Sequence, residues 1–288
     1  MRRWSFAKGH GTQNDFVVLL DRESMLHVDI AEAQQICNRH AGIGADGLLR
    51  AVRAQHVPEW SGDPDLWFMD YRNADGSIAE MCGNGVRVFA RFLLDEGLAS
   101  GPVVPIATRA GLKEATALPD TRIRVAMGPA RLTGNDVEVT TVDGTRFAAR
   151  GVDVGNPHAV SFLDQQPGLE LSDLSLHAPP TWVPEQAFPD GTNLEFVAEI
   201  GPQHIAMRVY ERGVGETQSC GTGTVAAAAA ARARIGSPAA DHAGPLTYRV
   251  DVPGGSVEVE FGDDGQTYLT GAAVIVAHGQ LSLPEELP

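Results

Sequence analysis

A four-residue motif that occurs twice restricts the fold of this chain more than any other feature. Cys82–Gly85 reads C-G-N-G and Cys220–Gly223 reads C-G-T-G, and each stands directly before a segment with a helical pattern. Upstream of them, Asn14–Val18 (N-D-F-V-V) resembles Asn156–Val160 (N-P-H-A-V) in the same order. Motifs that recur in one order indicate a duplicated unit, although short glycine-rich matches also arise by chance. The sequence therefore predicts two domains of related topology.

Each predicted domain has many strands and a single long helix. The second helix contains the run V-A-A-A-A-A-A at residues 225–231. Alanine is the best helix former, and a helix that is apolar on all sides belongs in a core. We therefore expect an α/β (α+β) fold with two pseudo-symmetric domains, each a strand-rich, barrel-like sheet around a central helix. The expected domains are residues 1–127, which carry Cys82, and 128–275, which carry Cys220, with a C-terminal strand near 276–288 as a candidate to return to the first domain.

A two-fold arrangement of these domains would place both helix N-termini at one cleft, and domain interfaces commonly hold ligand sites.

Hydrophobic periodicity and turn residues predict the individual elements. The expected strands are residues 2–8, 16–21, 48–52 and 66–71, several within 103–139, and several within 246–278. Helices are expected at residues 30–40 and from Val86 to Gly97, and the alanine-rich helix is expected to end near 235–238. The other segments are expected to be a loop at 9–15, a connection with a short helix at 165–190 and a frayed tail at 283–288.

Charge and cysteine content narrow the classes of function. The 288 residues carry a formal net charge of −15, which disfavours nucleic-acid and anionic-membrane partners because basic patches supply most of that affinity. Three cysteines, Cys37, Cys82 and Cys220, do not form the even-numbered pattern of a disulfide framework. The sequence shows no signal peptide and no apolar run of about 20 residues, the length of a membrane span. We expect a cytoplasmic protein.

Each motif cysteine stands where a helix is expected to begin. The first N–H groups of a helix lack intrahelical partners and carry partial positive charge, so they attract anions and favour a thiolate. The adjacent glycines let the backbone approach a ligand closely. The alternative is a cysteine that is simply buried. Cys37 lies within a helical pattern without such glycines, and we expect it to serve packing alone.

Two such thiols on opposite walls of one pocket could serve four purposes. One is a disulfide. A zinc site normally shows local Cys or His spacings and four ligands, which neither motif has, so we expect no metal. A Cys–His nucleophile needs one thiol and leaves the second copy unexplained. Proton transfer on both faces of one carbon uses both thiols, while the helix N-termini stabilise charge on an adjacent carboxylate. This last interpretation also agrees with the absence of a cofactor motif.

Longer blocks of sequence surround these motifs. In order along the chain they read G-H-G-T-Q-N-D-F-V-V-L, R-H-A-G-I-G-A-D-G, N-A-D-G-S-I-A-E-M-C-G-N-G-V-R-V-F-A-R-F-L, G-N-P-H-A-V, G-T-N-L-E-F-V and Y-E-R-G-V-G-E-T-Q-S-C-G-T-G. Together they resemble the signature of the diaminopimelate epimerase family. The resemblance implies a cofactor-independent isomerase with two pseudo-symmetric α/β domains, commonly a homodimer. Such an enzyme interconverts LL- and meso-2,6-diaminopimelate, on the lysine and peptidoglycan route, by two-base proton transfer between opposed cysteines.

The resemblance also implies roles for individual residues. Cys82 and Cys220 would transfer the proton, and His158 and Glu211 would tune the thiols. The residues implied to bind substrate are Asn14, Asn73, Gly83, Asn84, Asn156, Asn193, Glu211, Arg212, Gly221 and Thr222. Among them, the backbone of Gly83, Asn84, Gly221 and Thr222 would hold the reacting carboxylate, and the Arg212 guanidinium would hold the distal one.

Plainer interpretations stay open for several of these residues. Asn73 could merely support its N-A-D-G turn, Asn156 precedes a proline in a turn-prone site, and His158 could be structural. The Glu211–Arg212 pair, taken alone, could be surface charge. The family pattern is also not complete, since Gly47 stands where some members carry a substrate-binding Gln. Glu80 stands where many carry a neutral residue, and we expect it to face solvent.

Two other functions compete with the epimerase. A racemase of the proline or hydroxyproline type shares the chemistry of two cysteines, but Arg212 and the several asparagines suit a second amino-acid head group better. A redox or ligand-binding module would use a Cys82–Cys220 disulfide. Exchange of the α-hydrogen of LL-diaminopimelate in D2O would distinguish these possibilities.

Overall fold

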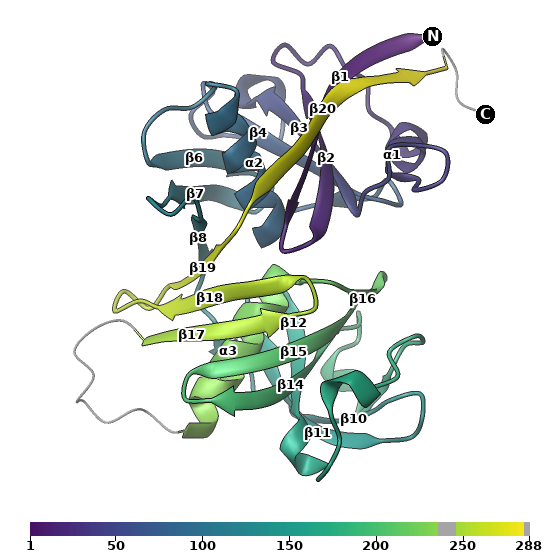
Figure 1. Ribbon diagram of the computed structural model, residues 1–288, viewed down its shortest axis with the longest axis vertical. Helices are drawn as coiled ribbons and strands as arrows, with labels where there is room; N and C mark the ends of the chain where they lie inside the picture. Colours follow the sequence, from purple (N-terminus) through teal and green to yellow (C-terminus); the bar gives the residue numbers. More distant parts are fainter. Residues whose placement is uncertain (236–245, 285–288) are drawn as a thin grey trace. The chain divides into compact units, whose positions relative to one another are not determined.

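The computed structural model describes residues 1–235 and 246–284, and the chain divides into two compact units. The first unit comprises Met1–Val125 and Gly271–Pro288, and the second comprises Ala126–Thr270. Both units are rich in strands and have few helices, which confirms the predicted α/β (α+β) class (Figure 1). The last strand, β20 (Val274–Leu283), shown in yellow, pairs with the first strand of the chain and belongs to the first unit.

In the first unit, the strands form a curved layer around helix α2 (Gly83–Asp95). Hydrogen bonding orders them β20, β1, β2, β3, β4, β6, β7, β8, with β5 added to β4. Their bounds are β1 (Arg2–Gly11), β2 (Asn14–Leu20), β3 (Gly47–Arg53), β4 (Trp67–Asn73), β5 (Ile78–Ala79), β6 (Val103–Thr108), β7 (Gly111–Ala117) and β8 (Ile123–Gly128). Helix α2 contacts strands from β20 to β7, so the sheet encloses it. The short helix α1 (Ile30–Cys37) contacts β3, and a 3₁₀ turn (Ala54–His56) follows that strand.

In the second unit, helix α3 (Gly221–Ile235) has the corresponding place. The strand order is β13, β10, β11, β12, β14, β15, β17, β18, β19, with β9 added to β11 and β16 to β15. Their bounds are β9 (Arg131–Leu132), β10 (Val137–Thr140), β11 (Arg146–Asp153), β12 (Pro157–Phe162), β13 (Thr181–Val183), β14 (Asn193–Gly201), β15 (His204–Glu211), β16 (Gly215–Thr217), β17 (Leu246–Val252), β18 (Gly255–Phe261) and β19 (Thr267–Gly271).

The two units repeat one order of strand pairing. From β1 to β8 the successive pairs are antiparallel, parallel, antiparallel, parallel, antiparallel and antiparallel. From β11 to β19 the same series occurs. Each helix also enters at the equivalent point, directly before the second strand of the second parallel pair. Chance would not reproduce this series, so the repeated motif marks a duplicated topology.

The alanine run lies in the core of the second unit. Ala226 to Ala231 are buried, between 0% and 5% exposed, and α3 contacts strands from β9 and β11 through β18. Because strands surround the helix, each side chain must be small enough for the sheet to close. The helix is described as far as Ile235. The rest of its predicted end, at 236–238, and residues 285–288 of the predicted frayed tail lie outside the described residues.

One local prediction was wrong, and another was too long. The expected loop at 9–15 is a tight hairpin, in which β1 pairs with β2 up to Gly11 opposite Asn14. Its two turn residues, Thr12 and Gln13, have φ angles of 55° and 60°, the left-handed conformation that two-residue hairpins require. Neither is a glycine, so their sequence did not signal the turn. The connection at 165–190 contains short helices of the 3₁₀ type (Leu171–Asp173, Glu185–Ala187), as predicted, together with β13, and α1 ends at Cys37 rather than near residue 40.

The predicted C-terminus of the first long helix is confirmed. α2 ends at Asp95, and Gly97 follows with a φ of 64°, as expected of a glycine just past a helix end. Across the described ranges, no helix combines the length and the apolar character that crossing a membrane would require.

Candidate active site

Cys82 caps the N-terminus of α2 in the first unit. Its backbone is extended, and its Sγ accepts a hydrogen bond from Gly85 N at 3.4 Å. The thiol also donates to Asn14 Oδ1 at 3.7 Å, which Asn84 Nδ2 approaches to 3.3 Å. Asn14 in turn donates to Asp46 Oδ2 at 2.8 Å. The predicted substrate-binding residues Asn14 and Asn84 therefore lie beside the predicted proton-transfer thiol.

A buried guanidinium lies farther along the same helix. Arg87 is 0% exposed, and it donates to Asn84 Oδ1 at 2.5 Å, Thr12 Oγ1 at 2.9 Å and Ala272 O at 2.8 Å. Among the described residues, no carboxylate forms an ion pair with it. Burial lowers the pKa of Arg87 to about 10, and its attraction to Cys82 opposes that change. This positive charge favours a thiolate at Cys82.

Asn73 lies within its own turn. Its Oδ1 accepts from Tyr71 Oη at 2.8 Å, and its Nδ2 donates to Ser77 Oγ at 3.0 Å. These contacts agree with the plainer interpretation, in which Asn73 supports the turn. The same tyrosine helps to explain why a glycine occupies position 47. A Cβ at that position would lie 2.7 Å from Tyr71 Cε2 and 2.9 Å from Arg72 O. A glutamine would therefore not fit at position 47 without movement of the Tyr71 ring.

Cys220 precedes α3 in the second unit with the same geometry. Its Sγ accepts from Gly223 N at 3.4 Å, and its backbone oxygen accepts from Thr224 N at 2.9 Å. The sulfur also lies 3.5 Å from Thr222 Oγ1. The residue is 6% exposed. Both motif cysteines thus receive a backbone N–H at the start of a helix, the position predicted from their sequence.

The groups around Cys220 are acidic. Burial raises the pKa of this thiol well above its usual value, and the charges of Glu211 and Glu195 raise it further. Burial likewise raises the pKa of both carboxyls, although Glu211 is partly compensated by hydrogen bonds from Thr217 and Cys220. A shift of this kind means that the neutral, protonated forms are favoured here. The site therefore holds Cys220 as a thiol.

Glu195 was not among the site residues predicted from the sequence. It lies on β14 with 0% exposure, and its Oε1 binds His158 Nδ1 at 2.7 Å. A Cβ at Gly223 would come within 2.6 Å of the same oxygen and 3.3 Å of Cys220 Sγ, so this carboxyl lies against the first turn of α3. A signal was present, since an acidic residue in the apolar strand N-L-E-F-V can be fully buried only with a partner.

His158 connects this carboxyl to a predicted substrate residue. Its Nε2 lies 2.9 Å from Asn156 Oδ1, and Asn156 Nδ2 donates to Thr222 Oγ1 at 3.3 Å. A continuous series of contacts therefore leads from Glu195 through His158, Asn156 and Thr222 to the sulfur of Cys220.

Asn193 and Arg212 lie together at the far end of β14 and β15. Asn193 Oδ1 accepts from Arg212 N at 3.0 Å, and its Nδ2 donates to Pro157 O at 3.3 Å. The Arg212 guanidinium donates to Asp190 O at 3.0 Å and is otherwise exposed. An exposed guanidinium can receive a carboxylate, whereas the amide of Asn193 is already engaged by the protein.

The sequence matches the profile of the diaminopimelate epimerase family over residues 6–133 and 151–276. Three relatives named diaminopimelate epimerase cover 96% of this chain and at least 95% of their own length. They come from Streptomyces coelicolor (48% identical), Corynebacterium glutamicum (46%) and Thermobifida fusca (45%). The chain belongs to the diaminopimelate epimerase family. The predicted family is therefore confirmed.

Solved structures of other enzymes share the fold of this epimerase family at much lower identity. A phenazine biosynthesis protein of the PhzF family from Bacillus anthracis matches with a TM-score of 0.67 at 15% identity, covering 98% of this chain and 100% of its own. A probable proline racemase from Agrobacterium radiobacter matches with a TM-score of 0.66 at 18% identity, covering 98% and 93%. These likenesses show a common fold alone.

Two further predictions for this member of the epimerase family are confirmed. Cys37 is 4% exposed within an apolar cluster that includes Ile36 and Leu48, and burial raises its pKa to about 12, as expected of a thiol that serves packing. Glu80 faces solvent. It therefore does not press a carboxylate against Cys82.

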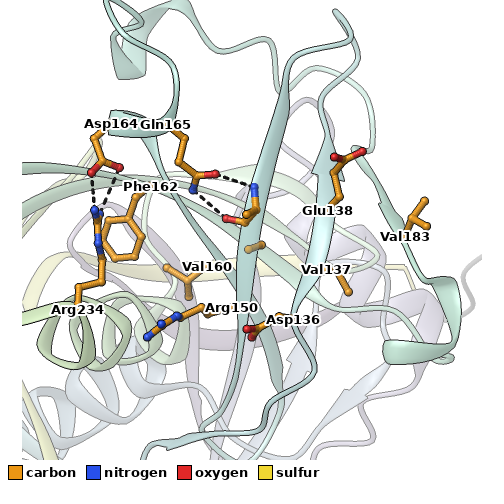
Figure 2. Close-up of a pocket in the computed structure, with 12 residues that line it drawn as sticks. Asp136, Val137, Glu138, Arg150, Val160, Phe162, Asp164, Gln165, Val183 and Arg234 are labelled. Carbon is orange, nitrogen blue, oxygen red and sulfur yellow. Dashed lines mark hydrogen bonds and ion pairs between the residues drawn. The ribbon is translucent and has the colours of Figure 1, made fainter. Parts of the chain in front are cut away.

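Two other features of the chain lie apart from the predicted site residues. A hollow of about 450 Å³ on the second unit is lined by residues of β10, β11 and β12, with Arg234 paired to Asp164 and Gln165 bonded to the Ala148 backbone (Figure 2). His27, Asp29 and Glu32 bring possible metal ligands within 4.8 Å of one another. However, the two carboxylates form the capping box of α1, and Glu32 also binds Arg2.

Proposed function

We propose that this chain is an isomerase that interconverts LL- and meso-2,6-diaminopimelate, a step toward lysine and peptidoglycan precursors. The observation that carries this proposal is the 45–48% identity to proteins named diaminopimelate epimerase over 96% of the chain. The competing function, a proline-type racemase, rests on a likeness of only 18% identity. The exposed guanidinium of Arg212 also suits the distal carboxylate of a longer, doubly charged amino acid.

The proposed reaction is proton transfer by two bases. One thiolate removes the proton from the α-carbon, and the charge left behind spreads onto the neighbouring carboxylate. The thiol of the other cysteine donates its proton to the opposite face, so the configuration inverts and the two sulfurs exchange protonation states. Backbone N–H groups at the starts of α2 and α3, from Gly83, Asn84, Gly221 and Thr222, would stabilise the carboxylate charge.

The two cysteines enter this reaction in different resting forms. The buried cation Arg87 favours a thiolate at Cys82, whereas the buried carboxyls Glu195 and Glu211 favour a thiol at Cys220. The resting enzyme would thus already hold one base and one acid. Asn14, Asn73, Asn156, Asn193 and Glu211 are proposed to bind the substrate's polar groups, with His158 and Glu211 tuning Cys220. We further propose a cytoplasmic homodimer that uses no metal and no cofactor.

Exchange of the α-hydrogen tests this function directly. The reduced protein is incubated with LL-diaminopimelate in D2O, and deuterium incorporation and formation of the meso isomer are followed by mass spectrometry and chiral chromatography. We expect both without an added cofactor. If the reduced protein catalyses neither exchange nor isomerisation of this substrate, the proposed function is wrong.

Single cysteine variants test the mechanism. Cys82→Ala and Cys220→Ala should each lower the rate of epimerisation by at least about 10³-fold, because a positioned acid or base contributes 10²–10⁴-fold and each face needs its own group. Cys37→Ala serves as the control and should retain most of the activity. Near-normal turnover by either motif variant would refute proton transfer by two cysteines.

A further inference from the structure

Glu195 and His158 form a fully buried pair next to Cys220. Both side chains are 0% exposed, and Glu195 Oε1 lies 2.7 Å from His158 Nδ1. The other carboxyl oxygen, Oε2, has no hydrogen-bond partner among the described residues. An isolated ionised carboxylate with a bare buried oxygen is costly. The pair is therefore best described as sharing one proton between Oε1 and Nδ1.

The contact on the other side of the ring determines where the second imidazole proton lies. Asn156 Oδ1, an acceptor, lies 2.9 Å from His158 Nε2. Because an oxygen cannot donate a hydrogen bond, Nε2 must carry a hydrogen. This holds whether the shared proton lies on Nδ1, as in an imidazolium–carboxylate pair, or on Oε1, as in a neutral imidazole with a carboxylic acid.

The orientation of the Asn156 amide follows from that hydrogen. With Oδ1 accepting from His158, the Nδ2 group points away and donates to Thr222 Oγ1 at 3.3 Å. The Thr222 hydroxyl is in turn 3.5 Å from Cys220 Sγ. If Nε2 lost its hydrogen, it would become an acceptor, and the amide would have to rotate by half a turn to donate to it.

We propose that Glu195 is a positioning residue that, through His158, fixes the amide orientation of Asn156 beside Cys220. Its effect on the reaction rests on the proposed epimerase function, in which Asn156 binds substrate. A group at position 195 that shares or donates a hydrogen to Nδ1 holds the ring with Nε2–H directed at Asn156. Leucine can do neither, whereas the amide NH2 of a glutamine can donate to Nδ1 and leave Nε2–H in place.

The surrounding charges are consistent with this assignment. The pair consists of His158 on β12 and Glu195 on β14, and the groups that face it are Glu211 on β15 and Cys220 before α3. Burial raises the pKa of Glu195, of Glu211 and of Cys220, and the interaction with His158 opposes that increase for Glu195. The histidine is therefore the one partner that can share a proton with Glu195.

Nitrogen NMR of the substrate-free protein tests the proposal independently of activity. With ¹⁵N-labelled histidine, wild-type His158 should show a protonated Nε2, assigned by its loss in His158→Asn. In Glu195→Leu, the Nε2–H signal should be lost because Nδ1 no longer has a partner that holds the ring, whereas Glu195→Gln should retain the signal because its amide can donate to Nδ1. Glu199→Gln, an exposed position on the same strand that binds Arg234, should leave it unchanged.

Two results would overturn the proposal. The first is a bare Nε2 in the wild-type protein, which needs no variant and so does not depend on whether Glu195→Leu folds. The second is a folded Glu195→Leu variant whose His158 Nε2–H signal is the same as in the wild type. Because neither measurement involves substrate, the proposed function could fail while this assignment stands.

Kinetics then separate positioning from a structural role. In Glu195→Leu, the KM for LL-diaminopimelate should rise by roughly 10-fold, the size of one lost hydrogen bond to a charged group, because the Asn156 amide is no longer held in one orientation, and Glu195→Gln should restore the wild-type KM. If Glu195 served folding alone, the fraction of active enzyme would fall and KM would stay at its wild-type value. A wild-type KM in Glu195→Leu would thus contradict the kinetic part of the proposal.

Discussion

Cys82 and Cys220 occupy the same position at the start of equivalent helices, but the buried charges near them differ in sign. Arg87 supplies a cation on the side of Cys82, and Glu195 and Glu211 supply acidic groups on the side of Cys220. A repeated motif therefore does not imply repeated chemistry. The difference arises from residues outside the motif, on β14 and β15 in the second unit and within α2 in the first.

Glu211 provides a test of these electrostatics through stability. Burial raises the pKa of Glu211 in the folded protein above its ordinary value of 4.5, so the folded state binds this proton more tightly than the unfolded state. The resulting stabilisation is fully present below pH 4.5 and is lost as pH rises through the folded pKa. Glutamine does not titrate, so the stability of Glu211→Gln relative to wild type should increase with pH.

We expect the stability of Glu211→Gln relative to wild type to be greater at pH 8 than at pH 5, because only the wild type loses the stabilisation from its bound proton as pH rises. Urea unfolding at the two pH values measures it. The control Glu216→Gln removes an exposed carboxylate that binds Arg208 and should show no such gain. An equal gain for Glu211→Gln at both pH values would contradict a titrating, buried carboxyl. The variant should also lose epimerase activity, since stability and function often oppose each other at such sites.

At the scale of single elements, α3 is the most constrained part of the second unit. Its alanines are enclosed by strands on all sides. Ala228→Leu inserts volume where none is free, and overpacking of this kind costs about 1–3 kcal/mol. Ala233→Leu, farther along the same helix and partly exposed, should change stability by less than about 0.5 kcal/mol. Thermal or urea unfolding of the two variants provides the comparison, and equal effects would show that enclosure does not determine the composition of the helix.

The same elements show what the sequence could predict. The alanine run predicted a buried central helix because its composition leaves no polar face. The hairpin at Thr12–Gln13 was missed because residues other than glycine rarely adopt positive φ angles, so their sequence gives no local signal. Glu195 was missed for a different reason, because its partner His158 lies on another strand and only the tertiary structure brings the two together.

For the whole molecule, the duplicated motif predicted the class of fold, and the common series of strand pairings supports the duplication. The places of Asn73 and Asn193 could not be predicted, because their hydrogen bonds go to protein groups in neighbouring turns and strands. The lack of space for a side chain at Gly47 could not be predicted either, because it depends on the orientation of the Tyr71 ring.

The proposed homodimer has a simple test at this scale. Sedimentation equilibrium of the reduced protein should give a particle of twice the 30.6 kDa chain mass at micromolar concentration. Addition of salt should leave that mass unchanged if apolar contacts hold the dimer, because salt screens only charge interactions between exposed groups. A mass of a single chain across the concentration range would contradict the dimer.

The return of β20 to β1 has a consequence for how the chain is made. Residues 126–270 form one continuous stretch, whereas the first unit needs Val274–Leu283 to complete the hydrogen bonding of its first strand. During synthesis the N-terminal part of a protein usually folds first. Here the later half has all its strands before the earlier half does, so Arg2–Gly11 leaves the ribosome with one edge unpaired and keeps it so until Val274–Leu283 has been made.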